Sequence, residues 1–305
     1  LREPQLQLTR ALRAIATLHD ARLQATSGWF HSAAAGGPEH QPAYVNCVAR
    51  VRTDMAPEEV LGKLQAIETD AKRTRSVTRW TPRTLDLDLL LYADRVQDDP
   101  SLTLPHPRMV VRQFVLQPAA QVAPDWEHPD CRWSLSQLAA HLRYAVPIVA
   151  LVGPTYAQRV SLCREILEAT DAQLLAWPEA IATADSGGLV AERRVQWRRI
   201  GQEQLAAFTW THLSAPIICP FWPSEFNDGG LTMDRPPNIP IPKVLIHIAP
   251  EAMSSDSCKT SHPCGPCSFQ HIRSRHWGPI LRIRSDTKRQ ILEECLAAIQ
   301  AMKPC

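Results

Sequence analysis

The most informative stretch of the chain is residues 72–92, which reads KRTRSVTRWTPRTLDLDLLLY. Its first 13 positions hold five cations and no acid, and its first carboxylate is Asp86. Leu85–Tyr92 predicts a β-strand, and because alternate side chains of a strand share a face, Asp86 and Asp88 point the same way. Two neighbouring carboxylates repel each other unless a hard cation lies between them, and Mg²⁺ suits such oxygen ligands. The stretch therefore predicts a magnesium site beside a basic loop, a combination typical of phosphoryl transfer.

The same alternation of Leu and Asp has a second interpretation. An edge strand whose acids and bases form a solvated salt-bridge face would show a similar pattern. Asp86 and Asp88 taken alone leave both interpretations open, and the basic residues that precede them favour the metal site.

Length and composition limit what the rest of the chain can be. A chain of 305 residues is expected to form two domains. Its 33 basic and 31 acidic residues give a net charge of +2, so no overall field attracts nucleic acid or an anionic membrane. The longest charge-free stretch, residues 204–224, contains three prolines and predicts no transmembrane helix. Without a basic-then-apolar leader, and with an odd number of cysteines, nine, we expect a cytoplasmic protein with reduced thiols.

The N-terminal half, residues 1–145, predicts a domain of mixed helices and strands. Apolar residues at helical spacing predict helices over residues 3–19, 57–69 and 134–143. Two β-like runs cover residues 22–31 and 43–52, with a small-residue loop between them. Residues 102–116 predict an irregular or hairpin return.

The C-terminal half, residues 146–305, predicts an α/β domain. Val146–Val152 is a continuous apolar run typical of a strand buried on both faces, and it ends at Gly153 before a helical stretch. A second buried strand is expected at Lys243–Ile248, and a final helix places Ile291 and Cys295 on one face. Strands that alternate with helices indicate a three-layer α/β arrangement.

Three motifs in order resemble a known family. They are RWTPRTLDLD at residues 79–88, LPHPRM at 104–109 and RQFVL at 112–116, and together they resemble the 6-hydroxymethyl-7,8-dihydropterin pyrophosphokinases of folate biosynthesis. The resemblance covers about residues 1–142. It implies an α+β ferredoxin-like fold and the activity of a 2-amino-4-hydroxy-6-hydroxymethyldihydropteridine diphosphokinase, which passes the β,γ-pyrophosphoryl group of ATP to the pterin hydroxymethyl oxygen and releases AMP.

The resemblance also implies roles for individual residues. Asp86 and Asp88 would hold two Mg²⁺ ions, Tyr44 and Phe114 would sandwich the flat pterin, and Asn46 would read its hydrogen-bonding edge. Arg73 would lie on a mobile loop that closes over the phosphates and would join Arg83 and the two aspartates as catalytic residues. ATP would be surrounded by Gln65, Glu68, Arg75, Trp80, Arg83, His106 and Arg112.

Each of these residues has a plainer interpretation. Tyr44 and Phe114 would serve equally as ordinary core or sheet packing, and Asn46 as an edge residue. His106 between two prolines would suit a turn, and Trp80 would cap a core. The co-occurrence of the motifs in order favours the binding site.

Three departures from the family pattern stand out. Leu1 matches the last residue of an opening Gly-Ser-Asn-Leu motif, so the first and central strand of the fold is expected to be missing from the chain by truncation. Ala33–Ala35 replaces a Thr-Pro-Pro segment, which puts pterin contacts there in doubt. Ser101 replaces an arginine, a change that weakens the expected ATP site.

The turn after Val146–Val152 predicts a defective phosphate-binding loop. A P-loop requires Gly-x-x-x-x-Gly-Lys-Ser/Thr, and here Gln158, Arg159 and Val160 stand at the last glycine, the lysine and the hydroxyl position. With a weak resemblance to deoxynucleoside kinases, this predicts a degenerate, non-catalytic P-loop-kinase-like domain that scaffolds or self-associates. An unrelated α/β domain with a glycine after a strand fits nearly as well.

A cluster of thiols and imidazoles near residue 264 offers a candidate zinc site. Cys264 and Cys267 have the spacing of two zinc ligands, and Cys258, His262 and His271 lie nearby. Incidental loop cysteines are the better interpretation.

The sequence therefore predicts an enzyme that takes ATP and a hydroxymethyl-dihydropterin, with magnesium as its cofactor and no nucleic acid or membrane as partner. Two alternatives remain open. One is a non-catalytic nucleotide-binding or interaction protein in which both sites have decayed. The other is a bifunctional pterin pyrophosphokinase and deoxynucleoside kinase.

Overall fold

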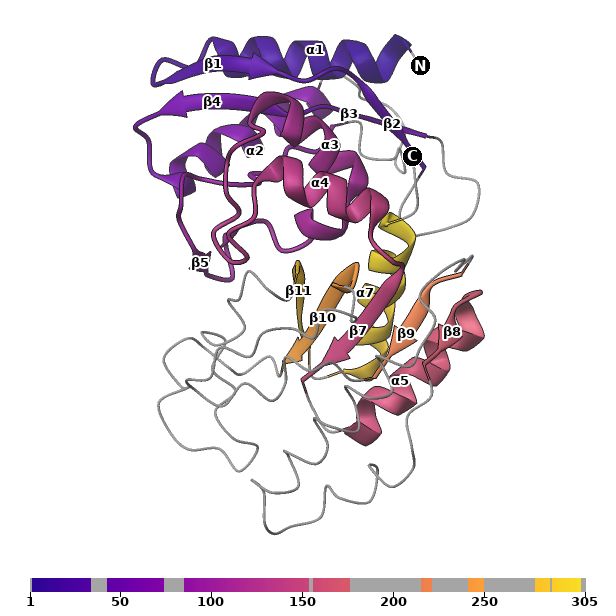
Figure 1. Cartoon of the computed structure of the whole chain (residues 1–305). Helices are drawn as coiled ribbons and strands as arrows, with labels where there is room; N and C mark the ends of the chain where they lie inside the picture. The colour runs from indigo at the N-terminus through magenta and orange to yellow at the C-terminus, as the bar shows by residue number, and fades with distance from the viewer. Residues whose placement is uncertain are drawn as a thin grey trace, which may run out of the picture. The chain divides into compact units, whose positions relative to one another are not determined.

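The computed structural model describes residues 2–33, 43–73, 85–153, 156–175, 215–220, 241–249, 278–285 and 287–302. Contacts divide the chain into two compact units, which run from Leu1 to Ala139 and from Ala140 to Met302 (Figure 1). This division falls a few residues before the expected boundary at residue 145. Within the described part of the chain, the helices are too short or too polar to cross a bilayer.

The N-terminal unit combines helices with three separate pairs of strands. The strands are β1 (Ala21–Thr26), β2 (Phe30–Ser32), β3 (Tyr44–Asn46), β4 (Ala49–Thr53), β5 (Gln97–Asp98) and β6 (Thr103–Leu104). The pairs β1–β4, β2–β3 and β5–β6 are all antiparallel. The two β-like runs predicted from the sequence are thus confirmed, but each one is broken into two short strands.

Three helices lie close to the positions predicted over residues 3–19, 57–69 and 134–143. They are α1 (Arg2–Ala16), α2 (Pro57–Arg73) and α4 (Leu135–Tyr144), and α4 spans the division between the two units. Helix α3 (Gln113–Val122) and the short 3₁₀ helix η1 (Met109–Val111) were not predicted, because residues 102–116 were expected to form an irregular or hairpin return. Proline and two glutamates open α2, since proline lacks the N–H that a first helical turn leaves unsatisfied and acids suit the helix N-terminus.

The predicted strand over Leu85–Tyr92 is wrong as a secondary-structure assignment. These residues are not hydrogen-bonded as a strand to any other segment that the structure describes. They still line a cavity together with all of β4, and the predicted alternation persists, because Leu85 is buried while Asp86 and Asp88 are exposed. A strand needs a partner for its backbone groups, and alternation alone cannot supply one.

The C-terminal unit is built on one parallel sheet with the strand order β11-β10-β7-β9-β8. The strands are β7 (Ile148–Val152), β8 (Gln173–Leu174), β9 (Ile217–Cys219), β10 (Val244–Ala249) and β11 (Ile280–Arg284). Helices α5 (Tyr156–Ala169) and α7 (Lys288–Ala301) contact each other (Figure 1). Every residue of β7 and β10 is buried, as their apolar runs predict.

Candidate active site

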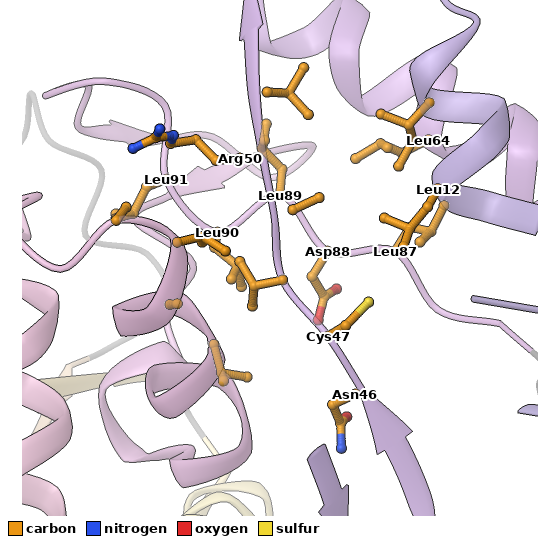
Figure 2. A pocket seen from close by; sticks show the side chains of 18 of the residues that line it. Leu12, Asn46, Cys47, Arg50, Leu64, Leu87, Asp88, Leu89, Leu90 and Leu91 are labelled. Atoms are coloured by element: carbon orange, nitrogen blue, oxygen red, sulfur yellow. The ribbon is translucent and has the colours of Figure 1, made fainter. Parts of the chain in front are cut away.

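The N-terminal unit contains a cavity of about 720 Å³ that brings the main predicted site residues together. It is lined by Tyr44 and Asn46 from β3, by Asp86 and Asp88, and by Arg112 and Phe114 at the start of α3. Figure 2 shows Asn46 and Asp88 among the side chains around it. Protein interiors seldom hold voids much larger than a water molecule, so a cavity of this volume has room for a ligand or a chain segment.

Hydrogen bonds to three neighbouring segments anchor residues 85–92. The Glu68 carboxylate of α2 accepts a hydrogen bond from the Leu87 N–H at 2.7 Å. The His106 N–H donates to the Leu90 carbonyl at 2.8 Å, and the Tyr92 hydroxyl donates to the Met55 carbonyl at 2.5 Å. These contacts fix the segment at three points along its length.

Asp88 lies beside two cationic or titratable side chains. Its carboxylate is 3.7 Å from His106 Nε2 and 3.6 Å from Arg112 Nη1. Burial lowers the pKa of His106, the Asp88 charge raises it in part, and Arg112 and Arg108 lower it further. The surroundings therefore hold the imidazole neutral more readily than in water, and Arg112 is the fixed positive charge next to Asp88.

The two aspartates fit a hard divalent cation by their chemistry. Both are exposed carboxylates that line the same cavity, and carboxylate oxygens are the donor type that Mg²⁺ takes. Among the described residues, no group of three or more His, Cys, Asp or Glu side chains gathers as a metal site. Two protein carboxylates suffice for Mg²⁺, since it usually completes its coordination with water and substrate phosphates.

Two aromatic side chains, Tyr44 and Phe114, line the same cavity as the aspartates. Tyr44 is 45% exposed, although a tyrosine in a sheet is usually well covered. Phe114 is half-buried, and the Arg112 guanidinium lies 5.8 Å from its ring centroid, within cation–π range. Both rings line the cavity, so they have the exposure that stacking on a planar ligand requires.

The remaining predicted ATP residues are only partly described. Gln65 is exposed on α2, one helical turn before Glu68. Arg73 is the last residue of α2, and its side chain lies outside the described part. Arg75, Trp80 and Arg83 lie outside the described residues, as do Cys258, Cys264 and Cys267 of the zinc hypothesis.

The structure describes two of the residues that depart from the family pattern, Ser101 and Ala33. Ser101 is exposed, and both its N–H and its hydroxyl donate to Asp99 Oδ1 within the β5–β6 hairpin, at 2.8 and 2.5 Å. Its described contacts are therefore those of a turn residue. Ala33 lines the cavity, while the other two alanines of Ala33–Ala35 lie outside the described residues.

Two cavity residues were missed by the sequence analysis. Ser32, at the end of β2, accepts a hydrogen bond from the Asn46 amide at 3.0 Å, and the Cys47 thiol lines the cavity next to Asn46 in sequence. Burial raises the pKa of Cys47, so the thiol stays protonated at neutral pH. What places Ser32 at the cavity is its pairing with Tyr44, and this pairing follows only from the β2–β3 register, which the sequence alone does not give.

At the carboxyl end of β7, Arg159 is turned toward main-chain carbonyls. It is 6% exposed, and its guanidinium donates to the Gly153 carbonyl at 2.7 Å and to the Pro220 carbonyl at 2.8 Å. Gly153 has φ +117°, and a Cβ there would stand 2.1 Å from the Ile248 carbonyl oxygen. This position therefore requires glycine for close packing against β10.

Carboxylates beside arginine and imidazole, in a cavity that two aromatic rings also line, fit an enzyme that transfers phosphoryl groups. A family model for 7,8-dihydro-6-hydroxymethylpterin-pyrophosphokinase matches residues 1–124. The chain belongs to this family, and the match includes β1–β4, both aspartates, Arg112 and Phe114.

Relatives from several bacteria show the same similarity. A Pseudomonas aeruginosa protein named 2-amino-4-hydroxy-6-hydroxymethyldihydropteridine pyrophosphokinase is 46% identical over 140 residues, which are 46% of this chain and 85% of that protein. Proteins of the same name from Haemophilus influenzae and Synechocystis are 42% and 41% identical over 130 and 131 residues. These matches each cover 43% of this chain, and 80% and 66% of the respective relatives.

Proposed function

We propose that this chain transfers the β,γ-pyrophosphoryl group of ATP to the hydroxymethyl oxygen of 6-hydroxymethyl-7,8-dihydropterin, in the cavity around Asp86 and Asp88. Family membership supports the reaction, a step of folate biosynthesis. The single observation that supports this location is a shared cavity. It is lined by five of the proposed site residues, which come from positions 44 to 114 of the sequence: Tyr44, Asn46, Asp86, Asp88 and Phe114. In the reaction, the hydroxymethyl oxygen bonds to the β-phosphorus, the bond from that phosphorus to the α-phosphate oxygen breaks, and AMP leaves.

We propose the following roles for the individual residues. Asp86 and Asp88 would hold magnesium, which when bound neutralises negative charge on the phosphate oxygens. Arg112, 3.6 Å from Asp88, supplies a fixed positive charge beside the place where phosphates would lie. Tyr44 and Phe114 would hold the pterin ring, and the other predicted ATP residues, Gln65, Glu68, His106 and the arginines of residues 73–83, would lie around the nucleotide.

A strand between β4 and residues 87–91 is part of this proposal. The cavity runs along all of β4 and along residues 87–93, and apolar residues of α1 and α2 line it as well. Such a slot fits an additional β-strand with apolar side chains toward the helices. With that strand in place, residues 85–92 would pair as the sequence predicts, and the ferredoxin-like sheet would be continuous.

For the C-terminal unit we propose a non-catalytic role. The guanidinium of Arg159 donates to two backbone carbonyls, and Gln158 and Val160 lack the bare backbone and the hydroxyl that a phosphate-binding loop uses. ATP-dependent phosphorylation of any deoxynucleoside, abolished by Arg159→Ala, would contradict this and favour the bifunctional enzyme.

The test of the main proposal is AMP formation from ATP in the presence of the hydroxymethyl-dihydropterin and Mg²⁺. It should be run on the chain as printed and on the chain with an N-terminal extension that encodes a β-strand. We expect AMP formation that depends on the pterin, and the higher rate from the extended chain. If neither protein releases AMP, the alternative of a decayed, non-catalytic protein is the correct one.

A further inference from the structure

The side-chain amide of Asn46 is held by two acceptors on the neighbouring strand. Its Nδ2 donates to the Phe30 carbonyl at 3.2 Å and to the Ser32 hydroxyl oxygen at 3.0 Å. A backbone carbonyl can only accept a hydrogen bond, so the atom that faces Phe30 has to be the amide nitrogen. This contact decides the orientation of an amide that would otherwise be ambiguous, because its oxygen and nitrogen have nearly the same shape.

Ser32 is placed to strengthen that orientation. It is 6% exposed, and it pairs with Tyr44 across β2 and β3, while Phe30 pairs with Asn46. Cross-strand partners and residues two positions apart share a face of the sheet, so these four side chains lie on one face. Ser32, Tyr44 and Asn46 also line the cavity.

Both hydrogens of the Asn46 amide are therefore used on β2, which leaves its Oδ1 as the atom that can meet a ligand. No side chain or N–H among the described residues donates a hydrogen bond to Oδ1. A carbonyl oxygen accepts hydrogen bonds, so this position matches a ligand edge that carries N–H groups. A pterin ring presents such donors at its 2-amino group and its ring N–H.

We infer that Ser32 is a positioning residue for pterin recognition, which holds the Asn46 amide so that Oδ1 accepts from the N–H edge of the ring. This inference rests on the proposed function. If the Ser32 oxygen is removed, one amide hydrogen loses its partner and the amide rotates more freely, so the acceptor is no longer fixed in place. ATP binding should be unaffected, because Ser32 lies on β2 and the proposed nucleotide residues lie on other elements.

The experiment is calorimetry of 6-hydroxymethyl-7,8-dihydropterin binding to the full chain, with Mg²⁺ and a non-hydrolysable ATP analogue present. Ser32→Ala should weaken pterin affinity about tenfold, while Ser32→Thr, which keeps the hydroxyl, should stay within about twofold of the wild type. The affinity for the ATP analogue should be the same in all three proteins. In an Asn46→Ala background, Ser32→Ala should have no further effect on pterin affinity, because the group that it positions is gone.

Ser27→Ala is the matched control. The Ser27 hydroxyl accepts from the Val48 N–H and donates to the Gly28 carbonyl, both at 2.9 Å. It therefore links the segment before β2 to the segment after β3, and none of its hydrogen bonds involves Asn46. We expect this variant to lose stability and to keep its pterin affinity. Unchanged affinity in Ser32→Ala, or an equal loss in Ser27→Ala, would overturn the role of Ser32. Absence of pterin binding to the wild-type chain would overturn the proposed function and this inference with it.

The side chain of Asn46 gives a second readout that does not depend on ligand. In wild-type protein the two Nδ2 protons have different partners, a carbonyl and a hydroxyl, so they should give separate and slowly exchanging NMR signals. Ser32→Ala should bring one signal toward its solvent-exposed position and speed its exchange, and Ser32→Thr should restore it. Signals that are identical in wild type and Ser32→Ala would overturn the hydrogen bond itself.

Discussion

The sheets of the two units are built in opposite ways. In the C-terminal unit, β7 and β10 are buried at every residue and sit at the interior of a continuous five-stranded parallel sheet. In the N-terminal unit, β1 alternates half-buried and exposed residues, and the sheet consists of separate antiparallel pairs beside a cavity of about 720 Å³. The central strands of the C-terminal sheet are fully buried, whereas the N-terminal unit has side chains at a cavity that are available to a ligand.

The two units also place their charged groups differently. The carboxylates of Asp86 and Asp88 are exposed at the cavity. In the C-terminal unit, the charged side chain of Arg159 is 6% exposed and is hydrogen-bonded to backbone carbonyls. Charge at an accessible cavity can act on a substrate, whereas a buried charge mainly affects folding.

The largest expected effect of a single substitution is on turnover, from the two aspartates. Asp86→Ala or Asp88→Ala should lower AMP formation by about three orders of magnitude or more, because metal-assisted charge neutralisation carries much of phosphoryl-transfer catalysis. Both variants should keep the wild-type far-UV circular dichroism spectrum, since neither side chain is buried. Steady-state kinetics in the presence of Mg²⁺ gives the measurement.

Asp94→Ala is the control for these variants, because Asp94 is an exposed carboxylate a few residues further along the chain that does not line the cavity. It should keep full activity. Near-normal turnover in both single variants would show that Asp86 and Asp88 are not the metal ligands.

A second test compares core packing in the two sheets. Leu151 of β7 is completely buried, and Leu151→Ala should lower the free energy of unfolding of the C-terminal unit by about 2–5 kcal/mol. Leu89 lines the open cavity and is only half-buried, so Leu89→Ala should cost the N-terminal unit about 1 kcal/mol. Native-state hydrogen exchange measures each unit separately. Equal losses would mean that the cavity is filled in solution.

The sequence was sufficient for the strands whose apolar runs determine them. Val146–Val152 and Lys243–Ile248 predicted β7 and β10 within two residues, because burial on both faces leaves a continuous local signal. Leu85–Tyr92 failed as a strand assignment, because strand pairing depends on a neighbour as well as on the segment itself. Even so, the predicted alternation persists in the burial of these side chains, since Asp86 and Asp88 are exposed while Leu85 is buried and Leu87 half-buried.

Site details that depend on long-range contacts could not be predicted. The Ser32–Asn46 hydrogen bond requires the β2–β3 register, which is set across a connection between residues 32 and 44. The contact of Arg159 with Pro220 joins residues 61 positions apart, so the sequence could indicate an altered phosphate-binding loop but not where the guanidinium lies. Elements with a local sequence pattern could be predicted, whereas contacts between residues far apart in the sequence could not.

A third test concerns His247, a buried histidine on β10 of the C-terminal sheet. Burial lowers the pKa of His247 to about 4, helped by the positive charges of Arg282, Arg284 and Arg159. As pH falls below about 6.5, the imidazole of His247 binds a proton in the unfolded chain but stays neutral in the folded unit. Stability should therefore be complete above pH 6.5 and fall by about 3 kcal/mol as the pH approaches 4.

His247→Gln should remove this part of the acid sensitivity of the C-terminal unit. His31→Gln serves as its control, since His31 is exposed on β2 in the other unit. Hydrogen exchange of β10 amides between pH 4 and 7, corrected for intrinsic exchange rates, reports the difference. A wild-type profile with no loss of stability in this range would mean that His247 is protonated readily in the folded state.

The smallest expected effect is a loss of pterin affinity on substitution of Phe114, which lines the cavity of the N-terminal unit. A half-buried ring that stacks on a planar ligand contributes about 1 kcal/mol, so Phe114→Ala should weaken pterin affinity about fivefold. The loss should be similar for the pterin and for close analogues, because stacking does not depend on the groups at the ring edge. Asn46→Ala should instead chiefly reduce discrimination between analogues that differ at that edge.

Phe114→Tyr is the control, since it keeps the ring and should bind the pterin within about twofold of the wild type. Calorimetry with the ATP analogue and Mg²⁺ present separates these outcomes. If neither Phe114→Ala nor Asn46→Ala changes pterin affinity, the pterin lies elsewhere, and the substitution at Ala33–Ala35 marks a remodelled pocket.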